Sequence, residues 1–213
     1  MDRGREEIAE GYRLLGRVNK LFRFADPFEK LIPQYLGEEK CRNLTLLDLG
    51  AGDGSLAREL TQWAAKRGWK WEVTCLDLNP DALQLNPSPR HVVGSALDLP
   101  FRDRTFDVVI ASQMTHHLPG DDAVARHFRE AWRVSREAVV IYDLHRNILL
   151  YTVIAIVLTA MRMPAHFKSD GLISVKRGWR VPEWTGLALQ AGIPNPTVWL
   201  EHGARITLLA RKG

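Results

Sequence analysis

A glycine-rich segment, Asp48-Leu49-Gly50-Ala51-Gly52-Asp53-Gly54, constrains the fold of this chain more than any other feature. It follows a nearly continuous apolar run, Leu44–Leu49, of the kind found in a strand buried on both faces. A helical pattern begins immediately after it and predicts a helix over Ser55–Lys66. Because glycine permits positive φ and a close approach of the backbone to a ligand, this strand–turn–helix unit is typical of an α/β domain that binds a cofactor.

The rest of the chain repeats this alternation of strands and helices. Further strands are predicted at Trp71–Leu78, His91–Ala96, Phe106–Gln113 and Ala138–Leu144, with helical stretches such as Val124–Val134 between them. Two apolar runs, Thr197–Glu201 and Arg205–Arg211, are joined by His202-Gly203-Ala204 and predict a β-hairpin. We therefore expect an α/β fold with a doubly wound, mostly parallel sheet that ends in an antiparallel hairpin.

Length and composition are typical of one soluble globular domain. The chain has 213 residues, of which 46% are hydrophobic and 25% charged, so disordered, collagenous and disulfide-built proteins are excluded. The two cysteines, Cys41 and Cys75, are too few for a disulfide framework or a C-x-x-C metal site. With no secretory signal at the N-terminus, we expect a reduced, cytoplasmic protein without a metal.

The glycine turn fits two types of cofactor, a dinucleotide and S-adenosylmethionine. The dinucleotide fingerprint places its third glycine three positions after the second, whereas Gly54 follows Gly52 by two. Asp48 would also repel a pyrophosphate, but it suits the ammonium group of a methionine moiety. These two features favour S-adenosylmethionine.

Two more carboxylates follow predicted strands. Asp77 ends the second strand, where it can accept hydrogen bonds from both ribose hydroxyls of either cofactor. Asp98 follows the third strand and can accept from an adenine amino group, with Leu78 and Leu99 on either side of the ring. This third carboxylate adds discrimination between the two cofactors.

Four segments carry a family resemblance: Leu46–Gly54, Leu76–Pro80, Asp98–Phe101 and Phe106–Ser112. In order and spacing they resemble the motifs of class I S-adenosylmethionine-dependent methyltransferases, over about residues 44 to 145. Within the class the chain is similar to the small-molecule branch that includes ubiquinone and menaquinone methyltransferases. The resemblance implies a Rossmann-like sheet of seven strands in a single domain, with the cofactor across the carboxyl ends of the strands.

The resemblance also implies roles for particular residues. Gly50, Ala51 and Gly52 would line the methionine end of the cofactor, and Asp77 would hold the ribose. Asp98 with Leu99 would contact the adenine, and Ser112 with Gln113 would border the sulfonium. We expect an N-terminal helical lid over residues 1–43, a cofactor-binding domain over 44–213 and a lid-like insertion within it at 146–181.

Three histidines are candidate general bases. His116 and His117 follow the fourth strand, at the expected mouth of the site, where an imidazole can deprotonate a phenol or an enol near pH 7. His145 follows the fifth strand and competes for the role. The alternative is that all three histidines have structural roles. His116 and His117 would pack the loop after the fourth strand, and His145 would cap a loop.

Two segments outside the sheet are candidate lids. Ile8, Tyr12, Leu15, Val18 and Phe22 lie on one face of an opening helix. The uncharged run Ile148–Met161 predicts a helix of about 21 Å, too short for the ~30 Å of a membrane core. A basic loop, Arg162–Arg180, follows, and His145–Val181 carries six basic residues and one acidic residue. This segment is a lid over a lipophilic substrate, a patch on an anionic membrane, or a helix buried in the core or in a dimer interface.

These features together predict an S-adenosylmethionine-dependent methyltransferase that acts on oxygen or carbon of a small aromatic or lipophilic metabolite. Ser112-Gln113-Met114-Thr115 stands where enzymes that methylate nucleobase amines have Asn-Pro-Pro-Tyr, so a nucleic-acid partner is disfavoured. The alternatives are an RNA or protein methyltransferase that uses the basic loop 162–180, a dinucleotide oxidoreductase, and a non-catalytic cofactor-binding module. Monomer and homodimer, and peripheral membrane contact, stay open.

Overall fold

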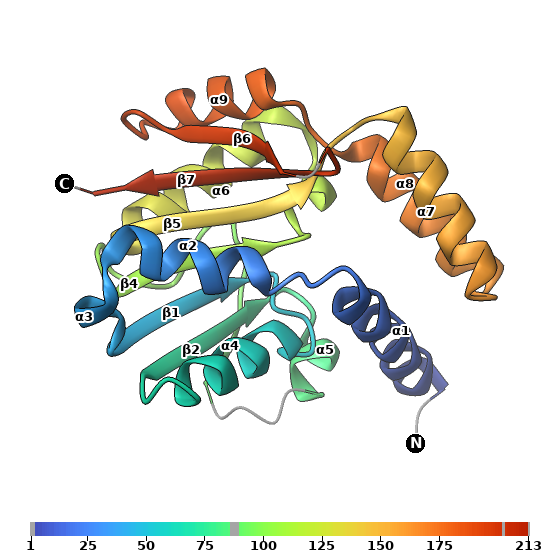
Figure 1. The fold of residues 1–213 in the computed structure, drawn as a ribbon, viewed down its shortest axis with the longest axis horizontal. Helices are drawn as coiled ribbons and strands as arrows, with labels where there is room; N and C mark the ends of the chain where they lie inside the picture. Colours follow the sequence, from blue (N-terminus) through green and yellow to red (C-terminus); the bar gives the residue numbers. More distant parts are fainter. Residues whose placement is uncertain (1–2, 86–89, 202, 213) are drawn as a thin grey trace.

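The computed structural model describes residues 3–85, 90–201 and 203–212 and has one seven-stranded sheet. The strands lie in the order β3-β2-β1-β4-β5-β7-β6 (Figure 1). Their bounds are β1 Asn43–Leu49, β2 Lys70–Asp77, β3 His91–Val93, β4 Phe106–Ser112, β5 Ser135–Leu144, β6 Thr197–Glu201 and β7 Arg205–Arg211. Strands β1 to β5 pair in parallel, and β7 runs antiparallel to both β5 and β6. This confirms the predicted sheet and its terminal hairpin; His202, in the predicted turn, lies outside the described residues.

Helices cover both faces of the sheet, which is why the central strands are apolar on both sides. On one face, Leu46 and Val108 pack against α2 (Asp26–Leu36) and α4 (Ser55–Ala65). On the other face, Leu47 and Val109 pack against α6 (Gly120–Val134) and α9 (Val181–Gln190). The short helices α3 (Glu38–Cys41) and α5 (Pro80–Gln84) complete the first layer. The sheet is therefore doubly wound, as expected.

Three helices extend beyond the carboxyl ends of the parallel strands, and we call them the helical cap. They are α1 (Arg3–Leu21), α7 (Ile148–Ala160) and α8 (Ala165–Arg177), and Figure 1 shows them at the end of the sheet toward which the parallel strands point. A separate hydrophobic cluster of α7 and α8 includes Ile154, Leu158 and Val175. Leu14 and Val18 of α1 pack against it, whereas Leu15 is 40% exposed. Leu14, and not the predicted Leu15, therefore lies on the packed face of α1 together with Val18. The side chain of Ile8 lies outside the described part.

The prediction of a basic loop over Arg162–Arg180 was wrong, because most of it is helix α8. Val175 is the only buried side chain of α8. Because so few side chains face a core, the sequence of α8 shows only a weak helical pattern of apolar residues. Its partner supplies the stabilisation: a Cβ atom at Gly171 would lie 3.0 Å from Leu158 Cδ1 of α7, so the glycine lets the two helices approach closely. Packing in the tertiary structure, absent from a local pattern, makes this segment helical.

The predicted strand His91–Ala96 is shorter than expected and ends at Val93. Strand β3 lies at the edge of the sheet and pairs only with β2, in the register Cys75–His91 to Asp77–Val93. Because β2 itself ends at Asp77, no partner backbone continues the ladder, and Gly94 makes a last hydrogen bond to Asp77 O.

Helix α7 has one buried face and one exposed apolar face. Leu150, Ile154 and Leu158 are buried, while Leu149 and Ile156 are 70% and 63% exposed. Among the described residues, no helix combines the length and the apolarity that crossing a membrane requires.

Two glycines give a stability prediction of opposite sign. A Cβ atom at Gly178 would lie 2.7 Å from Leu144 O, a backbone atom that cannot move aside easily, so Gly178→Ala should lower the free energy of unfolding by about 1–3 kcal/mol. Gly186 lies inside α9 with no atom within 4 Å of the position of an added Cβ atom. Gly186→Ala should therefore raise the free energy of unfolding by about 0.5–1 kcal/mol. Urea unfolding of both variants measures the difference, and equal effects would contradict the packing at Gly178.

Candidate active site

One large cavity lies at the carboxyl ends of the parallel strands, between the sheet and the helical cap. Its volume of about 2010 Å³ exceeds the roughly 300–1,000 Å³ of a pocket for one small molecule. Residues of α1, from Glu10 to Asn19, form one wall, and side chains of α7 and α8 form another. The cavity has room for a cofactor and a second small molecule, at the place where open α/β sheets bind ligands.

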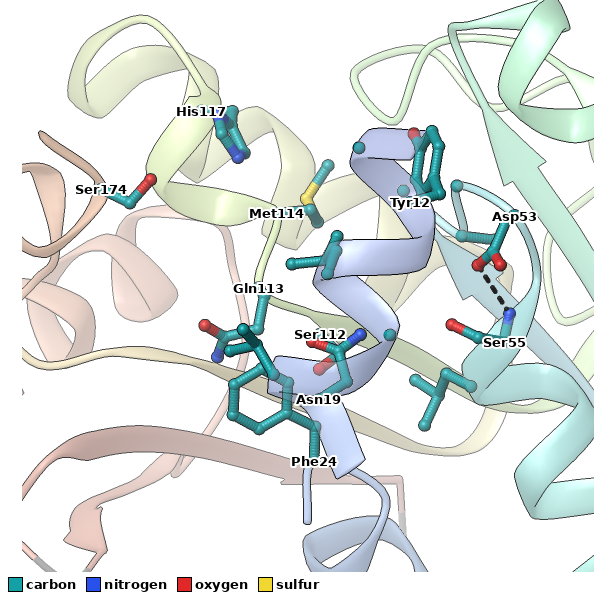
Figure 2. A pocket seen from close by; sticks show the side chains of 18 of the residues that line it. Tyr12, Asn19, Phe24, Asp53, Ser55, Ser112, Gln113, Met114, His117 and Ser174 are labelled. Carbon is teal, nitrogen blue, oxygen red and sulfur yellow. Dashed lines mark hydrogen bonds between the residues drawn. The ribbon is translucent and has the colours of Figure 1, made fainter. Parts of the chain in front are cut away.

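The glycine turn lies in this cavity and has the predicted backbone conformation. Gly50, Gly52 and Gly54 have φ of 70°, 54° and 67°. Cβ atoms at Gly50 and Gly52 would lie 2.7 Å from Met114 Cβ and 2.5 Å from Tyr12 Cε1. The glycines are thus required for the turn itself and for two side chains that pack on it; Figure 2 shows Tyr12 of α1 beside the turn.

The neighbouring carboxylates hold the turn in place. Asp53 Oδ1 accepts a hydrogen bond from the backbone N–H of Ser55, the first residue of α4, at 3.1 Å (Figure 2). Asp77 Oδ2 accepts from Gly52 N at 2.8 Å, and Asp77 Oδ1 accepts from Asn79 N at 2.8 Å. Each oxygen of Asp77 keeps one lone pair, so the carboxylate can still accept from two hydroxyl groups of a ligand.

Asp48 is a buried carboxylate that lacks a partner for one oxygen. It lines the cavity and is 1% exposed, and its Oδ2 has no hydrogen-bond partner among the described residues. Burial raises its pKa from 3.8 to about 8, and Asp77 and Asp53 contribute further. An unpaired buried carboxylate is costly for the free protein, and it is a strong site for a ligand cation.

Ser112 and Gln113 also lie in the cavity wall, at the end of β4. Gln113 has a positive φ of 57°, which is uncommon for a residue with a side chain, and its backbone N–H donates to Tyr142 O at 2.9 Å. Its side-chain nitrogen Nε2 is buried without a hydrogen-bond partner in the described part of the chain. The strained backbone thus holds an unsatisfied amide at the cavity.

His116 forms a buried pair with Asp143, at the end of β5. The distance from His116 Nδ1 to Asp143 Oδ1 is 2.6 Å, and His116 N donates to Asp143 Oδ2 at 3.1 Å. Burial opposes ionisation of Asp143, but His116 and the N–H groups of His116 and Leu144 outweigh it and hold its pKa below the ordinary value. An ionised Asp143 only accepts, so Nδ1 carries the proton and Nε2 of the neutral ring is left as the basic atom.

His117 lines the same cavity but is exposed, and no side-chain hydrogen bond orients it in the described part of the chain. Partial desolvation lowers its pKa, and the adjacent His116, with ring centroids 4.1 Å apart, lowers it further. Of the two predicted neighbours, His116 is therefore the oriented one.

Three of the predicted site residues do not line the cavity. Ser95, Ala96 and Leu97 are at its wall where Asp98 and Leu99 were expected. The side chain of Leu99 is buried away from the cavity, and its backbone N–H donates to Glu130 Oε2 at 2.8 Å. His145 lies beyond the cavity, with Nδ1 2.8 Å from Asn147 Nδ2. Leu78, in contrast, lines the cavity and is 72% exposed.

The structure adds residues to the cavity that the sequence did not assign to it. Tyr12 packs on Gly52, and burial, with Asp77 and Asp53 next, raises its pKa to about 12. Its helical spacing predicts a contact face but no ligand. Asn19 and Arg205 each have a buried side-chain atom without a hydrogen-bond partner among the described residues. No sequence signal marks either, because each comes from an element outside the cofactor motifs.

Comparisons with known proteins agree with this geometry. Residues 47–142 match the family model described as a methyltransferase domain. No curated protein matches the sequence significantly. A structure titled as a putative S-adenosyl-L-methionine-dependent methyltransferase from Methanococcus maripaludis is similar, with a TM-score of 0.63, 18% identity, and coverage of 95% of this chain and 92% of that chain.

Two longer solved proteins are also similar. The DszA carbon methyltransferase has a TM-score of 0.65 and 15% identity, over 94% of this chain and 57% of that chain. A putative O-methyltransferase from Nostoc punctiforme has a TM-score of 0.59 and 17% identity, over 88% of this chain and 56% of that chain. The chain thus spans little more than half the length of these two, and at such identities the likeness concerns the fold.

The family match, the strand order and the glycine turn together identify a class I S-adenosylmethionine-dependent methyltransferase domain in this chain. S-adenosylmethionine is the cofactor of this domain, and the site fits it. The unpaired Oδ2 of Asp48 suits the ammonium group, and the free lone pairs of Asp77 suit the ribose hydroxyls. The glycines of the turn between Asp48 and Asp77 have no Cβ atom that would obstruct the ligand.

Proposed function

We propose that this chain transfers a methyl group from S-adenosylmethionine to an oxygen or carbon atom of a small lipophilic metabolite, with His116 as the general base. The observation that carries the proposal is the buried pair of His116 and Asp143 at the wall of a cavity that has room for two molecules. The similar solved proteins include ones titled as O- and carbon methyltransferases, which agrees with these acceptor atoms.

The bound cofactor supplies an electrophilic methyl group on a sulfonium, and the protein supplies binding, alignment and a proton acceptor. Asp48 binds the ammonium group and Asp77 the ribose, with Gly50, Ala51 and Gly52 at the methionine end. Ser112 and Gln113 lie where the sulfonium is expected. Ala96 and Leu97, which line the cavity where Asp98 and Leu99 were expected, are the proposed adenine contacts. His116 Nε2 takes the proton of a hydroxyl or an enol as the methyl group is transferred, and Asp143 stabilises the resulting imidazolium.

Apolar side chains support a lipophilic acceptor. Leu144, Ile154 and Leu158 line the cavity on the side of the helical cap. Helix α1, whose Leu14 and Val18 pack against the same cluster, forms another wall of the cavity. The proposed lid therefore comprises α1 together with the insertion at 146–181, and it excludes water from the reacting atoms. The sequence resemblance to ubiquinone and menaquinone methyltransferases makes quinols and alkyl phenols the first acceptors to examine.

The proposal is tested by incubating the protein with methyl-labelled S-adenosylmethionine and a small-molecule extract of the host, and by identifying the labelled product by mass. We expect the label in a lipophilic metabolite, on oxygen or carbon, and faster transfer to long-chain than to short polar phenols. Label in RNA or protein, lost steeply as salt rises, would support the alternative that uses the basic segment 162–180. Binding of S-adenosylhomocysteine without any transfer would support a non-catalytic module.

A further inference from the structure

The geometry points to Arg205 as the recognition residue for a carboxylate on the acceptor, so that the second molecule in the cavity is a lipophilic acid. This inference rests on the proposed function, since it concerns the acceptor side of the same cavity. Arg205 begins β7, lines the cavity and is 5% exposed. Its Nη1 is buried and has no hydrogen-bond partner among the described residues.

The surroundings of Arg205 hold the guanidinium without neutralising it. Its Cζ lies 4.7 Å from the ring centroid of Phe24 and 5.5 Å from that of Phe22. The Tyr142 side chain is a further hydrogen-bond partner, and the Asp143 carboxylate, which pairs with His116, attracts the guanidinium without forming a salt bridge to it. No salt bridge to Arg205 occurs within the described ranges, although an unpaired buried charge is among the costliest groups in a protein. Aromatic rings and one phenol fix its position but leave its charge available for a ligand.

Two neutral polar groups accompany Arg205 in the same cavity. Gln113 Nε2 and Asn19 Oδ1 are buried and lack hydrogen-bond partners in the described part of the chain. The backbone N–H of Gln113 donates to the backbone carbonyl of Tyr142, whose side chain bonds to Arg205. The backbone carbonyl of Asn19 accepts from the backbone N–H of Phe24. Figure 2 shows Gln113, Asn19 and Phe24 on one side of the pocket. One cation, one amide donor and apolar walls suit a monoanion such as a carboxylate better than a phosphate dianion.

The carboxylate of the cofactor itself is the competing partner for Arg205. The sheet order places β4 and β5 between β1, which carries Asp48, and β7. Three strand spacings amount to about 14 Å, so Arg205 starts far from the glycine turn and on the acceptor side of the cavity. This separation favours the acceptor as the source of the anion.

The experiment measures binding of biphenyl-4-carboxylate and its neutral isostere, biphenyl-4-carboxamide, to the protein saturated with S-adenosylhomocysteine. We expect the carboxylate to bind at least tenfold more tightly than the amide. Arg205→Met should bring the ratio close to one and leave the affinity for S-adenosylhomocysteine unchanged, while Arg205→Lys should retain part of the preference. Arg162→Met, which removes an exposed charge from the turn between α7 and α8, is the matched control and should keep the full ratio.

Two results would overturn the inference. If Arg205→Met weakens S-adenosylhomocysteine binding as much as carboxylate binding, Arg205 serves the cofactor. If it lowers the melting temperature but keeps the preference for the acid, Arg205 is structural. For a ligand-binding arginine we expect the melting temperature of Arg205→Met to be unchanged or higher, because an unpaired buried charge is removed. A preference for the acid without methyl transfer in the extract would refute the proposed reaction and leave this binding site standing.

Discussion

Asp48→Asn is expected to lower the affinity for S-adenosylhomocysteine about 100-fold while the protein stays folded. The variant keeps the shape of the side chain and removes the charge that meets the ligand ammonium in a buried site, where such a pair contributes about 2–5 kcal/mol. Isothermal titration calorimetry measures the affinity. Asp103→Asn, at an exposed carboxylate paired with Arg133, is the control and should bind like the wild type.

The protonation of Asp48 gives a second measurable difference between the wild type and Asp48→Asn, the release of a proton on binding. Its pKa of about 8 keeps it mostly protonated at pH 7 in the free protein, whereas a bound ammonium favours the ionised form. Binding should then release up to one proton per site at pH 7, visible as a dependence of the binding enthalpy on the buffer, and Asp48→Asn should release none. Equal affinity and equal proton release in both proteins would show that the ammonium binds elsewhere.

The stability of the cofactor-free protein should follow from the same pKa. Because the folded pKa of Asp48 lies above its ordinary value of 3.8, the folded state holds a proton between pH 4 and 8 that the unfolded chain has lost. Stability should therefore fall as pH rises through this window, by at most about 1.4 kcal/mol per pH unit from this group, and level off above pH 8. In Asp48→Asn this part of the pH dependence should be absent.

His116→Asn is expected to lower kcat about 10²- to 10⁴-fold for an acceptor that must lose a proton, with unchanged S-adenosylhomocysteine affinity. The reason is the loss of the only side chain in the described cavity wall that is held as a base by a buried carboxylate. Asp143→Asn should give a similar loss, because an amide no longer fixes the proton on Nδ1. Single-turnover rates with the labelled acceptor measure the effect.

His117→Asn is the matched comparison, since it changes the adjacent imidazole in the same loop. We expect less than a tenfold loss, because His117 is exposed and unoriented. Raising the pH should restore part of the activity of His116→Asn with phenols, which ionise without a base at high pH, but not of a variant that has lost cofactor binding. A larger loss at His117 than at His116 would reverse the assignment.

Much of the cofactor half could be predicted from the sequence, because its determinants are local. The positive φ of Gly50, Gly52 and Gly54 follows from the residue types in a short segment. The apolar strands that surround them are equally visible, since a parallel sheet buried on both faces needs continuous apolar runs. Local sequence also predicted the terminal hairpin within its exact bounds.

The acceptor half could not be predicted in the same way, because its residues converge from distant elements. Helix α8 packs on α7, with Gly171 close to Leu158, and no local pattern shows this contact. His116 was one of three candidate bases until the pairing of β4 with β5 brought Asp143 beside it. Arg205 reaches the cavity only through the antiparallel pairing of β7 with β5.

The sequence by itself thus determined the sheet, the glycine turn and the type of cofactor, since backbone conformation and strand burial depend on neighbouring residues. Only the tertiary structure decided which imidazole is oriented, which buried charges lack partners and which helices close the cavity, since these depend on contacts between segments far apart in the chain.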